Sequence, residues 1–206
     1  DALELGYTPY YASLFDGIRN DVTKVLEIGV EPGRSHRLWL EYFPNATIYG
    51  FDIFKFGVEE FHQLQKGNPY LDRSIMFEGN QESVDNLEYF LSLHGNDFDI
   101  IIDDGSHEIN DQLNTIKNFW PKLKVGGYYI IEDLESTDYK EYFEMFEYCL
   151  FLDLRSLRDR WDDIIVILQK TSNDDISQIE QYCHETPPIP MKIIVLQPED
   201  PEDEIF

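Results

Sequence analysis

Two pairs of acidic residues and one histidine are the side chains of this sequence best suited to chemistry. Asp103, Asp104 and His107 follow one apolar run, and Glu132 and Asp133 follow another. Carboxylates held within a few ångströms of one another repel, so such a group either has raised pKa values or encloses a cation. Oxygen ligands favour Mg²⁺, with Mn²⁺ as an alternative ion. The five residues are therefore candidates for a cation site with a base beside it.

The apolar runs before these acids predict two buried strands. Residues 98–102, FDIII, form a continuous run rich in β-branched side chains, which is typical of a parallel strand covered on both faces. Residues 126–131, GGYYII, are a glycine turn that leads into a similar strand. Ligands of open α/β sheets bind beyond the carboxyl ends of the strands. If the two strands are neighbours, the four carboxylates and the histidine meet at one edge.

A strand, a glycine turn and a helix near the N-terminus predict a nucleoside site. Glu27, Gly29 and Gly33 have the spacing ExGxxxG, in which glycines let the backbone approach a ligand at a helix N-terminus. The next strand ends at Asp52, followed by Ile53. An acid about 20 residues after such glycines can accept hydrogen bonds from both ribose hydroxyls.

A third strand at 74–77 is followed by Asn80 and Gln81, whose polar side chains could contact an adenine edge. Asn80 could equally cap the next helix, and the local sequence favours neither interpretation. The other expected elements are an N-terminal helix packed on the sheet edge, helices at 57–66, 82–93, 108–120 and 139–148, an antiparallel pair of strands at 150–154 and 163–169, and one more strand at 191–196.

The composition indicates a globular protein of one domain, 1–206, with an N-terminal cap segment at 1–20 and an acidic tail at 198–206. Its formal charge of -25 makes nucleic acid an unfavourable partner, and no segment has the length of a membrane span. Two distant cysteines without a CxxC spacing indicate reduced thiols and a cytoplasmic location. The chain begins at Asp1 without an export signal, so we expect either a processed end or a unit excised from a larger protein. A homo-oligomer is compatible with the sequence.

Three blocks resemble the metal-dependent sugar O-methyltransferases of the macrocin and mycinamicin type, within the class I S-adenosyl-L-methionine-dependent methyltransferases. The blocks are YTPYY at 7–11, IDDGSH at 102–107 and FWPKLKVGGYYIIEDL at 119–134. The resemblance implies an α/β, Rossmann-like fold with a mostly parallel seven-stranded sheet, helices on both faces and an antiparallel C-terminal hairpin. It also implies S-adenosyl-L-methionine and Mg²⁺ as cofactors.

The resemblance assigns roles to single residues. Asp104, Glu132 and Asp133 match the magnesium ligands of the family, and His107 matches its proposed catalytic base. The matching cofactor positions are Glu27, Gly29, Gly33, Asp52 with Ile53, Asn80 and Gln81, while Asp103 would hold backbone or cofactor. Asn80 departs from the family, which commonly has Asp there, and the usual Asp-Lys before Tyr7 is missing.

These roles predict in-line methyl transfer to a sugar hydroxyl, with vicinal hydroxyls of a deoxysugar such as rhamnose held by the cation. A helix N-terminus and a nearby cation should keep His107 neutral at pH 7. Two other functions stay open, namely a catechol-type O-methyltransferase and a non-catalytic cofactor-binding module of a glycan-modifying polypeptide. A purely structural interpretation also stays open, in which Asp104 caps a helix, Glu132 and Asp133 orient loop amides, and His107 bonds to Asp111.

Overall fold

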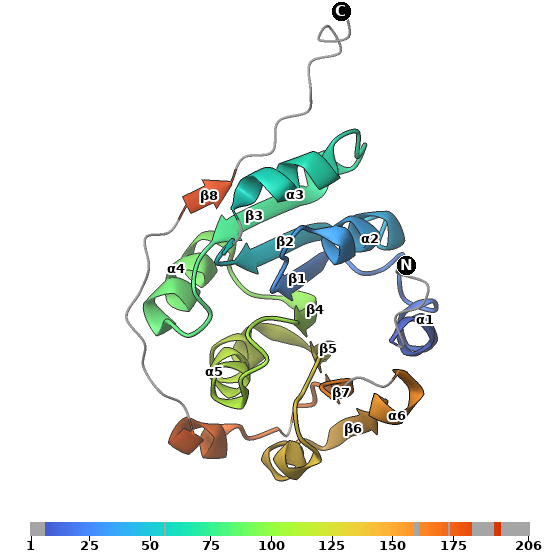
Figure 1. Cartoon of the computed structure of the whole chain (residues 1–206). Coiled ribbons are helices and arrows are strands. Elements are labelled where there is room, and N and C mark those ends of the chain that lie inside the picture. The colour runs from blue at the N-terminus through green and yellow to red at the C-terminus, as the bar shows by residue number, and fades with distance from the viewer. Residues whose placement is uncertain (1–6, 56, 159–160, 173, 183–191, 195–206) are drawn as a thin grey trace, which may run out of the picture.

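The protein is built around one twisted sheet with the strand order β6-β7-β5-β4-β1-β2-β3-β8 (Figure 1). The structure is a computed structural model that describes residues 7–55, 57–158, 161–172, 174–182 and 192–194. The strands are β1 (Lys24–Ile28), β2 (Thr47–Asp52), β3 (Ser74–Glu78), β4 (Phe98–Asp103), β5 (Leu123–Ile131), β6 (Tyr148–Asp153), β7 (Ile164–Gln169) and β8 (Lys192–Ile194).

The central strands β1 to β5 are parallel, and antiparallel strands extend both edges. At one edge, β7 pairs with β5 and β6 pairs with β7, which confirms the expected hairpin. These seven strands form the sheet that the sequence predicts. The further strand expected at 191–196 is present as the short β8, which pairs with β3 and makes the sheet eight-stranded. Residues 191, 195 and 196 lie outside the described residues, as do the first six residues and the acidic tail.

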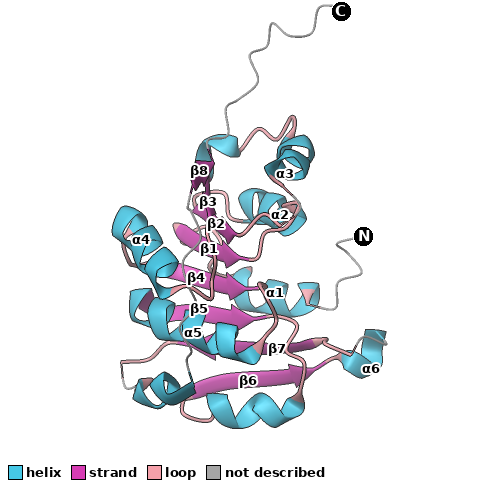
Figure 2. Cartoon of the chain, turned by 60° about the vertical axis from the view of Figure 1, so that its left-hand side comes forward, coloured by secondary structure: helices cyan, strands magenta, loops and turns pink. Residues whose placement is uncertain are grey.

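Helices cover both faces of the sheet (Figure 2). The α-helices are α1 (Thr8–Phe15), α2 (Arg34–Tyr42), α3 (Val58–Gln65), α4 (Val84–His94), α5 (Ile109–Phe119) and the short α6 (Arg155–Arg158). Single turns or short runs of 3-10 helix are η2 (Leu71–Arg73), η3 (Trp120–Lys122), η4 (Thr137–Phe143) and η5 (Ser177–Tyr182). Among these described helices, none is long and apolar enough to cross a membrane.

Alternation along the buried strands divides the core into two layers. Leu26 and Ile101 point toward α4 and α5, whereas Val25 and Ile100 point toward α1 and α2. Because successive side chains of a strand face opposite ways, a strand buried on both faces is apolar at most of its positions and not only at every second one. This explains the continuous apolar runs in the sequence.

Two expected elements differ from the structure. The N-terminal helix α1 does not pack on the sheet edge; Phe15 reaches the middle of the sheet face, where its ring lies 5.6 Å from that of Tyr128. The helix expected at 139–148 is instead the 3-10 run η4, and Tyr148 already belongs to β6. Pairing of β6 with β7 over residues 148–153 outweighs the local helical pattern there.

Candidate active site

The carboxyl ends of the central strands meet at one edge of the sheet, as the sequence predicts. Ile28 of β1 is in register with Phe51 of β2 and with Asp103 of β4, and Asp103 is in register with Ile131 of β5. The loops that follow these strands therefore lie side by side.

A cavity of about 460 Å³ opens between these loops, which is within the usual range for a small-molecule site. Seven of the residues singled out in the sequence line it, namely Gly29, Asp52, Ile53, Asn80, Gln81, Asp104 and His107. The lining also includes Gly79, directly before Asn80, and Gly105 and Ser106 of the IDDGSH block. The remaining lining residues were not anticipated: Glu31, Pro32, Phe51, Phe54, Lys55, Gly57, Glu60 and Glu82. Several of these directly neighbour an anticipated residue, so the strand-end rule could have found them.

Gly29 is required where β1 and β4 come closest. Its φ is +79°, and a Cβ atom there would lie 1.9 Å from the backbone carbonyl oxygen of Asp104. Any side chain would push the two loops apart. The glycine therefore lets the loop after β1 lie directly against the loop that carries Asp104.

The Asp52 carboxylate holds the loop that follows β1 through hydrogen bonds to its backbone. Its Oδ2 accepts hydrogen bonds from the backbone N–H groups of Val30 at 2.6 Å and Glu31 at 2.8 Å. These bonds occupy part of the carboxylate, which still lines the cavity and has further acceptor sites. Contact with a ribose stays a prediction.

Asn80 does not cap α4. The cap is Ser83, whose Oγ accepts from the N–H of Asn86, and Asn80 instead accepts from the N–H of Glu82 at 3.0 Å. Gln81 joins two loops, because its Oε1 accepts from the N–H of Ser106 at 3.0 Å. Both side chains thus shape the cavity wall through loop contacts.

Glu27 and Gly33 lie behind the cavity and are absent from its lining. Glu27 is buried, and its carboxylate accepts from Trp39 Nε1 at 3.1 Å and lies 3.1 Å from His36 Nδ1. A Cβ atom on Gly33 would lie 2.4 Å from the ring of Phe61. The structure thus gives both residues a packing role around α2 and α3, and their predicted cofactor contact stays a prediction.

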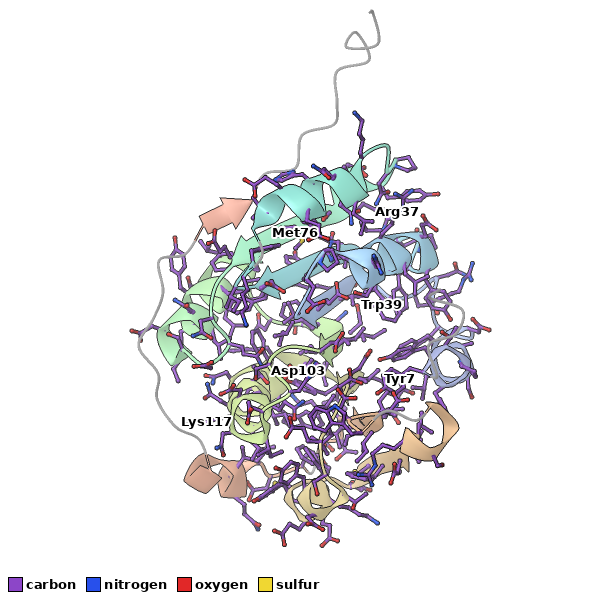
Figure 3. All side chains as sticks on the ribbon, in the orientation of Figure 1. Tyr7, Arg37, Trp39, Met76, Asp103 and Lys117 are labelled. Atoms are coloured by element: carbon purple, nitrogen blue, oxygen red, sulfur yellow. The ribbon has the colours of Figure 1, made fainter. Side chains whose placement is uncertain are left out.

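Asp103 is likewise enclosed. Its side chain, labelled in Figure 3, is fully buried. It accepts a hydrogen bond from Thr115 of α5 and lies 3.4 Å from the hydroxyl of Tyr129. Burial raises the pKa of Asp103 to about 7. Asp103 does not line the cavity, and it accepts a hydrogen bond from the backbone of Gly105, which fits the backbone-holding alternative. Cofactor contact stays a prediction.

Asp104 and His107 form a pair at the mouth of the cavity. His107 Nε2 lies 3.2 Å from Asp104 Oδ1, so the expected bond to Asp111 is made by Ser106 instead. Burial raises the pKa of Asp104 to about 6. The hydrogen bond that the His107 ring donates to the Asp104 carboxylate raises the pKa of His107 to about 8. Among the protein's own groups, the Asp104 carboxylate outweighs the helix N-terminus and favours the protonated ring. The neutral ring at pH 7, which we expect beside a bound cation, stays a prediction.

Asp133 completes a compact group with this pair. One ligand atom each from Asp104, His107 and Asp133 lies within 4.8 Å of the others, a spacing suited to a metal ion. Glu132 is adjacent but outside this group, and its carboxylate accepts a hydrogen bond from the Tyr11 hydroxyl. Burial, and then the Asp104 charge, raise the pKa of Glu132 well above its usual value.

The loops that hold this group have unusual backbone conformations. His107 has φ of +62° and Asp133 has φ of +52°, in the left-handed region that residues other than glycine rarely adopt. Such conformations persist only where the surrounding structure enforces them, and they concentrate at functional sites. Their presence in both loops supports a functional interpretation of the group.

Comparison with known proteins identifies the fold and the family. A family model described as "Methyltransferase domain" matches residues 26–134, more than half of the chain. The chain belongs to this methyltransferase family. The matched region runs from β1 to the loop after β5 and contains every anticipated site residue.

Similar proteins with curated names are sugar-directed O-methyltransferases. The chain is 35% identical over 136 residues to the 8-demethyl-8-(2-methoxy-alpha-L-rhamnosyl)-tetracenomycin-C 3'-O-methyltransferase of Streptomyces olivaceus, covering 62% of this chain and 32% of that protein. It is 37% identical over 137 residues to the mycinamicin VI 2''-O-methyltransferase of Micromonospora griseorubida, covering 62% and 31%. The chain thus spans about a third of the length of these relatives.

A solved structure of the MycE methyltransferase from the mycinamycin biosynthetic pathway is 26% identical to this chain with a TM-score of 0.55. The similarity covers 82% of this chain and 50% of that chain, whose structure is a complex with Mg, SAH and mycinamycin VI. The predicted class I methyltransferase fold is confirmed.

Proposed function

We propose that the chain is the catalytic unit of a divalent-metal-dependent O-methyltransferase, which transfers a methyl group from S-adenosylmethionine to a hydroxyl of a deoxysugar such as rhamnose. The observation that carries this proposal is the compact group of Asp104, His107 and Asp133, of which Asp104 and His107 line the cavity. Support also comes from the relatives, whose names specify O-methylation of a rhamnosyl compound and of a mycinamicin.

The cavity fits the cofactor in both size and charge. S-adenosylmethionine supplies a methyl group on a positively charged sulfur. Acidic residues of the lining, among them Glu31, Asp52 and Asp104, place negative charge around the cavity. Loops that begin with glycine turns leave room for a nucleoside, and the carboxyl edge of a parallel sheet is where this fold class binds one.

The carboxylates of Asp104, Glu132 and Asp133, called the acidic group below, fit a magnesium ion because they supply oxygen ligands. Manganese could take the place of magnesium. Asp104 and Asp133 would hold the ion, and Glu132 would join them through a carboxylate oxygen. A bound cation supplies positive charge that balances these carboxylates and makes a neighbouring hydroxyl more acidic. Close carboxylates with raised pKa values are the arrangement that such an ion stabilises.

His107 is suited to remove the proton of the acceptor hydroxyl. A neutral ring that donates Nε2–H to Asp104 Oδ1 has its lone pair on Nδ1, which is then the atom that takes up the proton. Asp104 would fix both the tautomer and the orientation of the ring. The chain's contribution is therefore alignment and proton removal, since the methyl group is already activated.

The proposal is tested by labelled methyl transfer from S-adenosylmethionine to rhamnosides carrying free vicinal hydroxyls. We expect transfer with Mg²⁺, loss with EDTA, and recovery when Mg²⁺ is added back. Full activity after exhaustive chelation would show that the acidic group is structural. Preferential transfer to catechols would establish the aromatic alternative, and cofactor binding without transfer to either acceptor would favour the non-catalytic module.

A further inference from the structure

Two tyrosines, Tyr7 at the N-cap of α1 and Tyr11 within α1, contact the acid pair that follows β5. The hydroxyl of Tyr7 donates a hydrogen bond to Asp133 Oδ1 at 2.6 Å, and the hydroxyl of Tyr11 donates to Glu132 Oε1. More than 120 residues separate each donor from its acceptor in the sequence. The helix thus provides one donor for each of two consecutive carboxylates.

The two hydroxyls are held firmly in place. Tyr7, Tyr11 and Phe15 are spaced four residues apart, so they lie along one face of α1, and all three are buried. The Tyr11 ring stacks on Phe15 at 5.9 Å and meets Trp39 edge to face at 5.2 Å. Tyr7 lies at the sheet-facing side of α1 (Figure 3). Because the rings are packed and buried, the positions of the two hydroxyl groups are fixed.

These tyrosines are suited to donate and not to lose their protons. A phenol hydroxyl with its ordinary pKa of about 10 keeps its proton at neutral pH and donates it in a hydrogen bond. A carboxylate has about four lone-pair sites, so accepting one bond leaves sites for a cation. The donors also reduce the mutual repulsion of the carboxylates before any ion binds.

We propose that Tyr7 and Tyr11 are positioning residues, which hold the carboxylates of Asp133 and Glu132 in the orientation that binds the divalent cation. This inference rests on the proposed function. It extends the site to α1, which precedes the region 26–134 matched by the family model. Partners that orient metal ligands commonly contribute 10- to 100-fold in metal affinity.

The test measures Mn²⁺ binding to the 206-residue chain with saturating S-adenosylhomocysteine, from the paramagnetic resonance signal of free Mn²⁺. Tyr7→Phe and Tyr11→Phe keep the rings and remove only the hydroxyls, and each should weaken Mn²⁺ binding by about 10- to 100-fold. Tyr42→Phe is the matched control. Its hydroxyl donates to Asp16 Oδ1 at 2.6 Å and ties α2 to the end of α1, away from the acidic group. This variant should bind Mn²⁺ as the unmodified chain does.

A double-mutant cycle separates a specific bond from a general loosening of α1. In a Glu132→Gln background, Tyr11→Phe should have little further effect on Mn²⁺ binding, because the carboxylate that it orients is gone. Circular dichroism confirms that each variant is folded, and Tyr7→Phe tests the inference by itself if Tyr11→Phe does not fold.

Three results would overturn the inference. Unchanged Mn²⁺ affinity in both tyrosine variants would do so while leaving the metal site intact. An equal loss in Tyr42→Phe would show that docking of α1, and not the hydroxyls, matters. Failure of the unmodified chain to bind Mn²⁺ would remove the proposed metal site, and this inference with it.

Discussion

The acid pair at the end of β4 and the acid pair after β5 lie on neighbouring strands but are held from opposite faces of the sheet. Asp103 is bonded to Thr115 of α5, on the face covered by α4 and α5. Glu132 and Asp133 are bonded to Tyr11 and Tyr7 of α1, on the other face. The two pairs look alike in the sequence, yet Asp103 and the pair after β5 have hydrogen-bond partners on opposite faces, and only Asp104 of the β4 pair joins Asp133 in one group.

The difference shows that the position of an acid relative to the strand end decides its use. Asp103 is the last residue of β4, still within the sheet, and is enclosed by the core. Asp104 is one residue further, where its side chain is 33% exposed and reaches the cavity. We expect mutations to separate these neighbours, with Asp104 affecting chemistry and Asp103 affecting stability.

The largest effect should come from Asp104→Ala, which removes both a metal ligand and the partner of His107. We expect turnover to fall by at least about 10²–10⁴-fold, the range for loss of a catalytic proton transfer, with little loss of stability. Methyl-transfer kinetics and thermal unfolding measure the two quantities. If Asp104→Ala kept the turnover of the unmodified chain, the proposed difference between Asp103 and Asp104 would be wrong, because both acids would then be structural.

His107→Ala should lower kcat by roughly 10²–10⁴-fold while affinity for S-adenosylhomocysteine stays near that of the unmodified chain. The variant lacks the imidazole that removes the proton, whereas the loops proposed to bind the cofactor are unchanged. Steady-state kinetics and calorimetry measure these effects. A parallel loss of Mn²⁺ affinity would instead make His107 a metal ligand, and unchanged turnover would mean that water takes the proton.

Asp103→Ala should act on stability. It removes the acceptor used by Thr115 and Tyr129, so buried hydroxyls lose a partner, at a cost of about 1–3 kcal/mol in the free energy of unfolding. Denaturant unfolding measures this loss, and the folded enzyme should retain far more turnover than Asp104→Ala. A stable Asp103→Ala variant that cannot bind S-adenosylhomocysteine would restore the predicted cofactor role.

The smallest effect concerns protonation. In EDTA, carbon-detected magnetic resonance of labelled histidines should give His107 a pKa of about 8, because Asp104 stabilises the imidazolium. With a pKa of about 8 the ring is protonated at pH 7. If no cation lowered this pKa, the fraction of neutral His107 able to act as a base would increase as the pH rises through 8. Asp104→Asn should lower the pKa toward the ordinary value of about 6.5. Mg²⁺ should also lower it, since a cation disfavours imidazolium, whereas a pKa unaffected by Asp104→Asn would contradict the pairing.

Local patterns were enough to predict the buried strands and the edge where the site lies, and the family resemblance supplied the fold. Continuous apolar runs predict strands buried on both faces, and the acids and glycines directly after them predict loops at the carboxyl edge, because both rules depend only on nearby residues. Gly29, Asp52, Asp104 and His107 accordingly lie at the cavity as expected.

Tertiary structure alone decided the direction and the partner of each side chain. Glu27 turns toward Trp39 of α2, Asp103 toward Thr115 of α5, and α1 lies on a sheet face and not at its edge. The bonds from Tyr7 and Tyr11 to the β5 acids join segments more than 120 residues apart. No local pattern encodes such contacts, since they arise only when helices before and after a strand pack on opposite faces of the same sheet.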